Sequence, residues 1–132
     1  EQLKKVHRFA RQRAQVADWY DTALADLPIV RPPHSVSGDL HSWHLYVVQL
    51  ADGVTMHRNQ VIEHLFAKGI GCSVHYIPLH RQPYWRDTYG LTPEMFPVSQ
   101  RIYERTLSLP MYSRMTQADV SRVVAALKEV LG

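Results

Sequence analysis

The side chains best suited to chemistry in this sequence are histidines and tyrosines near its middle. His75, Tyr76 and His80 cluster between a strand-like segment and a proline-rich stretch, and Tyr84 follows shortly after. Imidazole and phenol groups can donate and accept hydrogen bonds, and imidazole titrates near neutral pH. Because binding groups are common on loops next to regular elements, a ligand-binding edge is one interpretation. A histidine that only fills the protein interior is the other, and spacing alone leaves both open.

The eight histidines do not follow a metal-ligand pattern. His41 and His44 precede a predicted strand, while His57 and His64 lie seven residues apart with no carboxylate at a ligand spacing between them. Neither an HExxH motif nor a paired CxxC occurs. A GxSxG nucleophile motif and a glycine-rich phosphate loop are also missing. We therefore predict no metal site and assign no catalytic residue.

Length and composition indicate one soluble domain. The 132 residues are 45% hydrophobic and 20% charged, which is ordinary for a globular protein. No apolar run approaches the roughly 18 residues needed to cross a bilayer, and the charged start is unlike a signal peptide, so we expect a cytoplasmic protein. Cys72 can form no internal disulfide and is expected to pack. The start at Glu1, without an initiator methionine, suggests a truncated or processed chain.

The positive charge is concentrated at the start of the chain. The net charge is +3, and residues 1–13 hold five Lys or Arg against Glu1, which is +4 and leaves −1 for residues 14–132. A basic helix can contact phosphates, but the aromatic stacking residues of single-strand binders are not interleaved here. We expect no nucleic-acid partner, and a basic nucleic-acid-binding domain is kept as an alternative.

Hydrophobic periodicity and turn residues divide the chain into alternating elements. A helical period runs to Pro28, and the proline- and serine-rich segment that follows, up to Ser37 and Gly38, supports neither a helix nor a central strand. Later breaks fall at Asp52-Gly53, at Lys68-Gly69 and at prolines. The predicted helices are residues 2–26, 57–68, 98–106 and 116 to the end, and the predicted strands are residues 44–50, 70–77 and 107–110.

The stretch 78–97 holds four prolines and several aromatic residues, so we expect an irregular but packed loop there. The element order predicts an α+β fold, in which helices cover a small, mostly antiparallel sheet and a long N-terminal helix leads in. We expect a single domain over residues 1–132, made of a linking helix at residues 1–27 and an α+β sandwich at residues 28–132.

Four sequence motifs follow one another along the chain. They are SWHLYVV at 42–48, GIG at 69–71, VHYIPLH at 74–80, and LSLPMY at 107–112 with Met115-Thr116. In this order they resemble the C-terminal part of the DegT/DnrJ/StrS sugar aminotransferases, and the resemblance covers essentially the whole chain. The spacing of Arg13, Ala17, Tyr20 and Leu24 agrees with the long helix that precedes these motifs in the family.

The resemblance implies a fold, a reaction and a cofactor. Members have a large α/β domain that binds pyridoxal phosphate on a lysine and a smaller C-terminal α+β domain, and only the latter matches here. They transfer an amino group, usually from glutamate, to a keto group of a nucleotide-linked sugar. Their His-Tyr pair faces the sugar, which implies His75 and Tyr76 as substrate-binding residues, with His80 and Tyr84 as further candidates.

The lysines of this chain do not match the attachment site of the cofactor. That chemistry needs a lysine kept neutral by desolvation or by a neighbouring charge. Lys4, Lys5, Lys68 and Lys128 lie on predicted polar helix faces or at a helix end, so we expect each to be solvated. The isolated chain is accordingly expected to bind no pyridoxal phosphate and to be inactive.

A small domain separated from its large domain should expose apolar surface and self-associate, and we expect a homodimer. An alternative from another class is a stand-alone ligand-binding or oligomerisation module that keeps the fold without catalysis. An upstream coding segment with an SxxxK-type lysine would favour the enzyme, and translation starting near Glu1 would favour the module.

Overall fold

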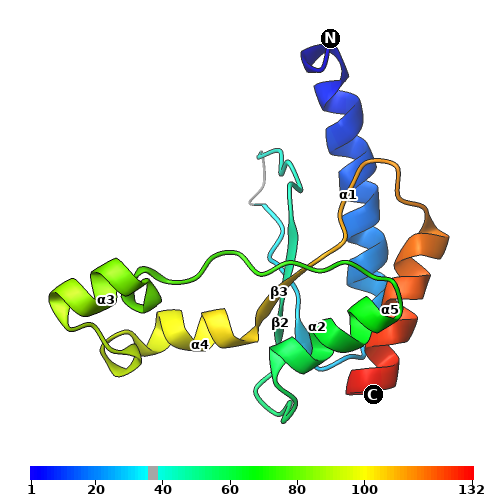
Figure 1. Cartoon of the computed structure of the whole chain (residues 1–132). Coiled ribbons are helices and arrows are strands. Elements are labelled where there is room, and N and C mark those ends of the chain that lie inside the picture. The colour runs from blue at the N-terminus through cyan, green and yellow to red at the C-terminus, as the bar shows by residue number, and fades with distance from the viewer. Residues whose placement is uncertain (36–38) are drawn as a thin grey trace.

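The computed structural model describes residues 1–35 and 39–132, and it confirms the α+β class. Strands β1 (Ile29–Val30), β2 (Tyr46–Leu50) and β3 (Thr106–Leu109) form an antiparallel sheet in the order β1-β2-β3. Helices α1 (Val6–Ala23), α2 (Arg58–Ala67) and α5 (Gln117–Leu131) pack together beside this sheet (Figure 1). None of the described helices is long and apolar enough to span a bilayer.

Helix α1 confirms the predicted long N-terminal helix. A 3-10 turn, Leu3–Lys5, leads into it, and the N-terminal end of the helix projects away from the rest of the chain (Figure 1). Farther along, Val16, Ala17 and Tyr20 are buried on one face, as the helical period requires. The helix ends at Ala23, three residues earlier than predicted, and Leu24 still packs in the core.

The sheet contributes the other half of the core. Tyr46, Val48 and Leu50 on β2 alternate with half-buried residues, and Leu107 and Leu109 on β3 are buried beside them. The strands predicted at 44–50 and 107–110 are therefore confirmed. The sequence pattern did not predict β1, a two-residue strand at the edge of the sheet. Prolines lie close to it, and an edge strand tolerates the N–H groups that prolines lack. The predicted connection at Ser37 and Gly38 lies outside the described residues.

The two core helices beside the sheet begin and end where the sequence predicts. Thr116 and Asp119 form a reciprocal capping box at the start of α5, and His57 caps α2 with Gln60 in the same way. Gly69, with φ at +72°, ends α2 in the left-handed conformation that glycine adopts without strain.

The predicted strand at 70–77 is wrong. Ser73 pairs with Ser108 through an isolated bridge, and beyond it the chain leaves the sheet and runs outward (Figure 1). The backbone there has no neighbouring strand to bond with, and Pro78 has no N–H to donate. Residues 74–105 form a projection that we call the arm, and the rest of the chain is the body.

The predicted irregular loop at 78–97 is also partly wrong, because most of it is helical. It contains the 3-10 turns Leu79–Arg81 and Pro93–Met95 and the helix α3 (Pro83–Tyr89), and it leads into α4 (Pro97–Arg105), which confirms the helix predicted at 98–106. The prolines stand in the first turns of three of these elements, where the missing N–H has no intrahelical partner to lose. Proline therefore starts helices here instead of preventing them.

Candidate functional site

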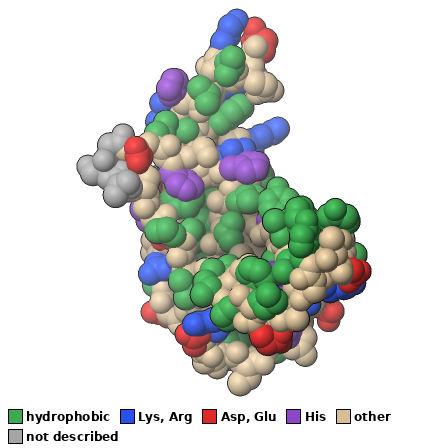
Figure 2. All heavy atoms as spheres, turned by 90° about the vertical axis from the view of Figure 1, so that its left-hand side faces the viewer, with side chains coloured by type: hydrophobic (Ala, Val, Ile, Leu, Met, Phe, Trp, Pro, Cys, Tyr) green, Lys and Arg blue, Asp and Glu red, His purple; other side chains and the backbone are tan. Residues whose placement is uncertain are grey.

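An open apolar groove of about 820 Å³ runs along the arm. One wall is the segment 75–79, the other comes from residues 96–99, 102 and 103 at the start and on one side of α4, and Thr106 completes the lining. Small-molecule sites usually measure about 300–1,000 Å³ and are mainly apolar with a few polar groups, which describes this groove. Figure 2, in which the arm faces the viewer, shows hydrophobic side chains gathered over it.

His75 and Tyr76 lie together on the rim of the groove. Their rings meet edge to face with centroids 5.4 Å apart, and both side chains are exposed, Tyr76 by 84%. Neither side chain is buried, because this segment is not paired in a sheet and has no pleat that would turn one of them into the core. Both polar groups are therefore accessible to a ligand in the groove.

The other two candidates lie elsewhere. His80 is only 4% exposed, does not line the groove, and places its Nε2 atom 3.0 Å from Oε1 of Gln100. Tyr84 lies on the exposed surface of α3, edge to face with Trp85. The structure thus brings His75 and Tyr76 together at the groove and places His80 and Tyr84 away from it.

The lysines are all solvated, as predicted. Lys4 pairs with Glu1 at 2.8 Å, Lys68 pairs with Glu129 at 2.5 Å, and none of the four lines the groove. An exposed ammonium group lacks the desolvation that makes a lysine a nucleophile. The lysines of this chain therefore do not fit the covalent attachment of pyridoxal phosphate.

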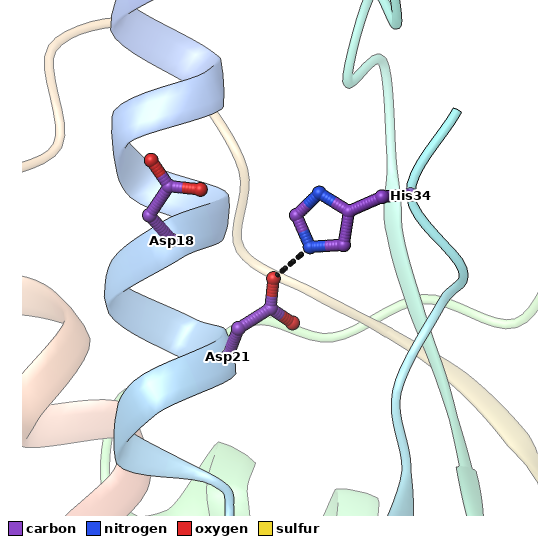
Figure 3. Close-up of side chains that lie close together, drawn as sticks. All are labelled: Asp18, Asp21 and His34. Carbon is purple, nitrogen blue, oxygen red and sulfur yellow. Dashed lines mark hydrogen bonds and ion pairs between the residues drawn. The ribbon is translucent and has the colours of Figure 1, made fainter. Parts of the chain in front are cut away.

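A separate cluster on the body brings Asp18 and Asp21 of α1 near His34 (Figure 3). Asp21 already has partners on both carboxylate oxygens: the Tyr46 hydroxyl at 2.6 Å and Nε2 of His34 at 2.5 Å. Burial, followed by the bond to Asp21, raises the pKa of Tyr46 well above its usual range. We assign this network a structural role, since it ties β2 to α1. Sequence spacing did not reveal it because His34 lies in the proline-rich connection.

Sequence analysis also missed the residues that fix α4 to the body. Arg58 is buried, and its Nη1 donates to the carbonyl oxygens of Tyr103 at 2.8 Å and Thr106 at 2.9 Å. Nη2 of Arg101 bonds both carboxylate oxygens of Asp52, at 2.6 and 2.7 Å. These partners lie more than 40 residues apart in the sequence, so no local pattern signals them.

Comparison with known proteins gives consistent matches. Residues 1–128 match the DegT/DnrJ/EryC1/StrS aminotransferase family. The spore coat polysaccharide biosynthesis protein SpsC of Bacillus subtilis is 37% identical over an alignment that covers 98% of this chain and 34% of SpsC.

Two solved structures have the same fold. Spr1654, a proposed sugar aminotransferase of Streptococcus pneumoniae in its PMP form, matches with a TM-score of 0.87 and 25% identity over 98% of this chain and 32% of that protein. DesI in the presence of its TDP-sugar product matches with a TM-score of 0.81 and 25% identity over 96% of this chain and 32% of DesI. The chain spans about a third of the length of the curated relatives it matches.

Proposed function

This chain belongs to the DegT/DnrJ/EryC1/StrS aminotransferase family, and we propose on that basis that it forms the small C-terminal domain of a sugar aminotransferase that uses pyridoxal phosphate. The observation that carries the proposal is the family match over residues 1–128, which includes both the body and the arm. We call the protein of the relatives' length that contains this chain the full enzyme.

The proposed substrate is a nucleotide-linked keto sugar, with glutamate as the amino donor. DesI, which shares this fold, is described with a TDP-sugar product. In this chain, His75 and Tyr76 present an imidazole and a phenol at the rim of an open groove. Such groups suit the hydroxyl and diphosphate oxygens of a nucleotide-linked sugar, because each can donate or accept a hydrogen bond.

The role of this chain in the reaction is to bind and orient the substrate. When bound, pyridoxal phosphate supplies the electron sink that amino transfer requires. The residues of this chain that we assign a part are His75 and Tyr76, which would hold the polar groups of the sugar. The apolar side chains of Ile77 and Ile102 on the groove walls would keep water from one side of it. We assign no proton transfer to any residue of this chain.

Substitutions in the full enzyme test this assignment. We expect His75→Ala and Tyr76→Phe each to raise the KM for the sugar nucleotide by about 2- to 10-fold, the value of one hydrogen bond, with unchanged affinity for pyridoxal phosphate. Tyr89→Phe is the matched control, because Tyr89 is exposed on α3 and does not line the groove. Loss of cofactor binding with an unchanged KM would contradict the proposal.

A second experiment concerns the chain by itself. Because its four lysines are solvated, we expect treatment with pyridoxal phosphate and borohydride to give no more labelling than an equal concentration of the urea-unfolded chain. Intact-mass and peptide mass spectrometry would measure this. Stoichiometric labelling of one lysine in the folded state alone would show that this chain holds an attachment site after all.

We also propose that the enzyme is a homodimer in the cytoplasm. The uncovered apolar surface of the arm supports association, because large exposed apolar patches mark interaction sites. The lone free thiol, Cys72, is in keeping with a reducing compartment. Sedimentation velocity of the full enzyme, with Phe96→Asp on the arm and Phe66→Asp on α2 as a matched pair, tests whether the arm contributes to the dimer.

A further inference from the structure

The two walls of the groove are joined behind it by a buried histidine. Among residues 74–105, all of which the structure describes, His80 is the single buried side chain. Its ring stacks on Phe96 with centroids 5.0 Å apart and an interplanar angle of 15°, and its Nε2 lies 3.0 Å from Oε1 of Gln100. His80 directly follows the wall at 75–79, and Phe96 and Gln100 both belong to the stretch 96–103 that forms the other wall. These contacts therefore fix the two walls relative to each other.

The orientation of the Gln100 amide determines which ring nitrogen of His80 carries the proton. The Nε2 group of Gln100 donates to the carboxylate of Glu104, one helical turn farther along α4. A carboxylate only accepts hydrogen bonds, so the amide nitrogen of Gln100 faces Glu104 and the amide oxygen faces His80. His80 must then donate from Nε2. The contact is therefore directional, which favours one arrangement of the two walls.

A second contact continues this brace to the body. The guanidinium of Arg81 lies 5.1 Å from the ring centroid of Tyr103, and that of Arg58 lies 5.0 Å from the same centroid. Tyr103 lines the groove, and Arg58 also bonds its carbonyl oxygen. Both guanidinium groups therefore make cation–π contacts with the same ring. The residue after His80 is thus tied through Tyr103 to α2.

We propose that His80 is a positioning residue for the substrate groove: through Gln100 and Phe96 it holds the segment that carries His75 and Tyr76 at a set distance from α4. His80 itself does not line the groove, so it acts through the two rim residues. A groove held open in its binding geometry loses less conformational entropy when a ligand binds. The proposal rests on the proposed function in one respect, that the groove receives the substrate.

The first test uses the 132-residue chain and no substrate. In ¹⁵N relaxation measurements, His80→Ala and Gln100→Leu should lower the order parameters of the amides at 75–77 from about 0.85 to below about 0.6. His64→Ala is the matched control, because His64 is partly buried on α2, lies outside the arm and does not line the groove. Order parameters that stay unchanged in Gln100→Leu would overturn the proposal, even if His80→Ala fails to fold.

NMR of the same chain also reports the tautomer of His80. The proposal expects a proton on Nε2 in the wild-type chain, seen in long-range ¹H–¹⁵N correlation spectra of the imidazole. A wild-type His80 that carries its proton on Nδ1 alone would overturn the proposal, because Nε2 could not then donate to Gln100.

The second test uses the full enzyme and separates positioning from general stability. His80→Ala should raise the KM for the sugar nucleotide by about 2- to 10-fold, because it weakens the hydrogen bonds that the rim residues make. In a Tyr76→Phe background the further effect of His80→Ala should shrink, because the group it positions has been removed. Fully additive effects would overturn the proposal. If the full enzyme transfers no amino group, the proposed function fails, and the relaxation test still decides the role of His80.

Discussion

The body and the arm of this chain use hydrophobic residues in opposite ways. The body buries them: every buried hydrophobic side chain lies outside residues 74–105. The arm exposes them: among the residues that the structure describes, it carries ten of the sixteen large hydrophobic side chains that are exposed, and its one buried side chain is a histidine. The difference indicates that the body supplies the stability of the fold, whereas the arm is built to contact something else.

The largest effect should come from truncating a core residue of the body. Leu107→Ala on β3 removes a side chain with no exposed surface and should lower the free energy of unfolding by about 2–5 kcal/mol. Ile102→Ala on the arm, where the side chain is 45% exposed, should change it by about 0.5 kcal/mol or less. Urea unfolding followed by circular dichroism measures both. Equal losses would remove the distinction between the two regions.

The reaction rates of two thiols, one in the body and one on the arm, compare the burial of the two regions. Burial raises the pKa of Cys72, which packs against the core, to about 11. A cysteine introduced at the exposed Ser99 on the arm should keep a pKa near 8.5. Since the thiolate is the reactive form, the Ser99→Cys thiol should react with a disulfide reagent at pH 8 roughly a hundredfold faster. The rates should become equal in urea, and equal rates in the folded chain would contradict the buried position of Cys72.

Removing Arg58 should loosen the junction between the two regions. Arg58→Met deletes the donor to the carbonyl oxygens of Tyr103 and Thr106, and leaving such groups unpaired should destabilise the chain by about 1–3 kcal/mol. Arg114→Met is the control, because Arg114 is exposed and lies outside the arm and its junction with the body. Amide hydrogen exchange should rise in α4 before it rises in α5. A uniform rise in both helices would show that the arm and body unfold as one unit.

The smallest effect should come from protonating the carboxylate of Asp52. The hydrogen bond and charge of Arg101, assisted by Arg105, hold the pKa of Asp52 below its usual range. A carboxyl with a lowered folded pKa stabilises the fold above its ordinary pKa, 3.8, and loses that contribution as the pH falls through the lowered value. Amide shifts in the last turn of α4 should therefore move below about pH 4, and Asp52→Asn should abolish that step. A shift that persists in Asp52→Asn would assign it to another carboxyl.

The same two regions differ in how well the sequence predicts them. In the body, the period of α5 from Val120 to Leu127 and the alternation of β2 reflect a buried face, so local patterns identify the elements. In the arm no face is buried, so the composition gave wrong predictions. Pro83 and Pro97 begin helices where a loop was expected, and the β-like residues 74–77 have no strand to pair with. His75 and Tyr76 could be selected as candidates, but their shared exposure depends on that missing strand.

The most direct test of this account is a crystal structure of the full enzyme with a nucleotide-linked sugar bound. We expect the sugar to lie in the groove of the arm, with a side-chain atom of His75 or Tyr76 at hydrogen-bond distance, about 2.7–3.2 Å, from one of its oxygens. We also expect His80 to keep its bond to Gln100 and not to touch the ligand. A sugar bound elsewhere, with the groove filled by protein side chains, would contradict the account and identify the groove as a docking surface.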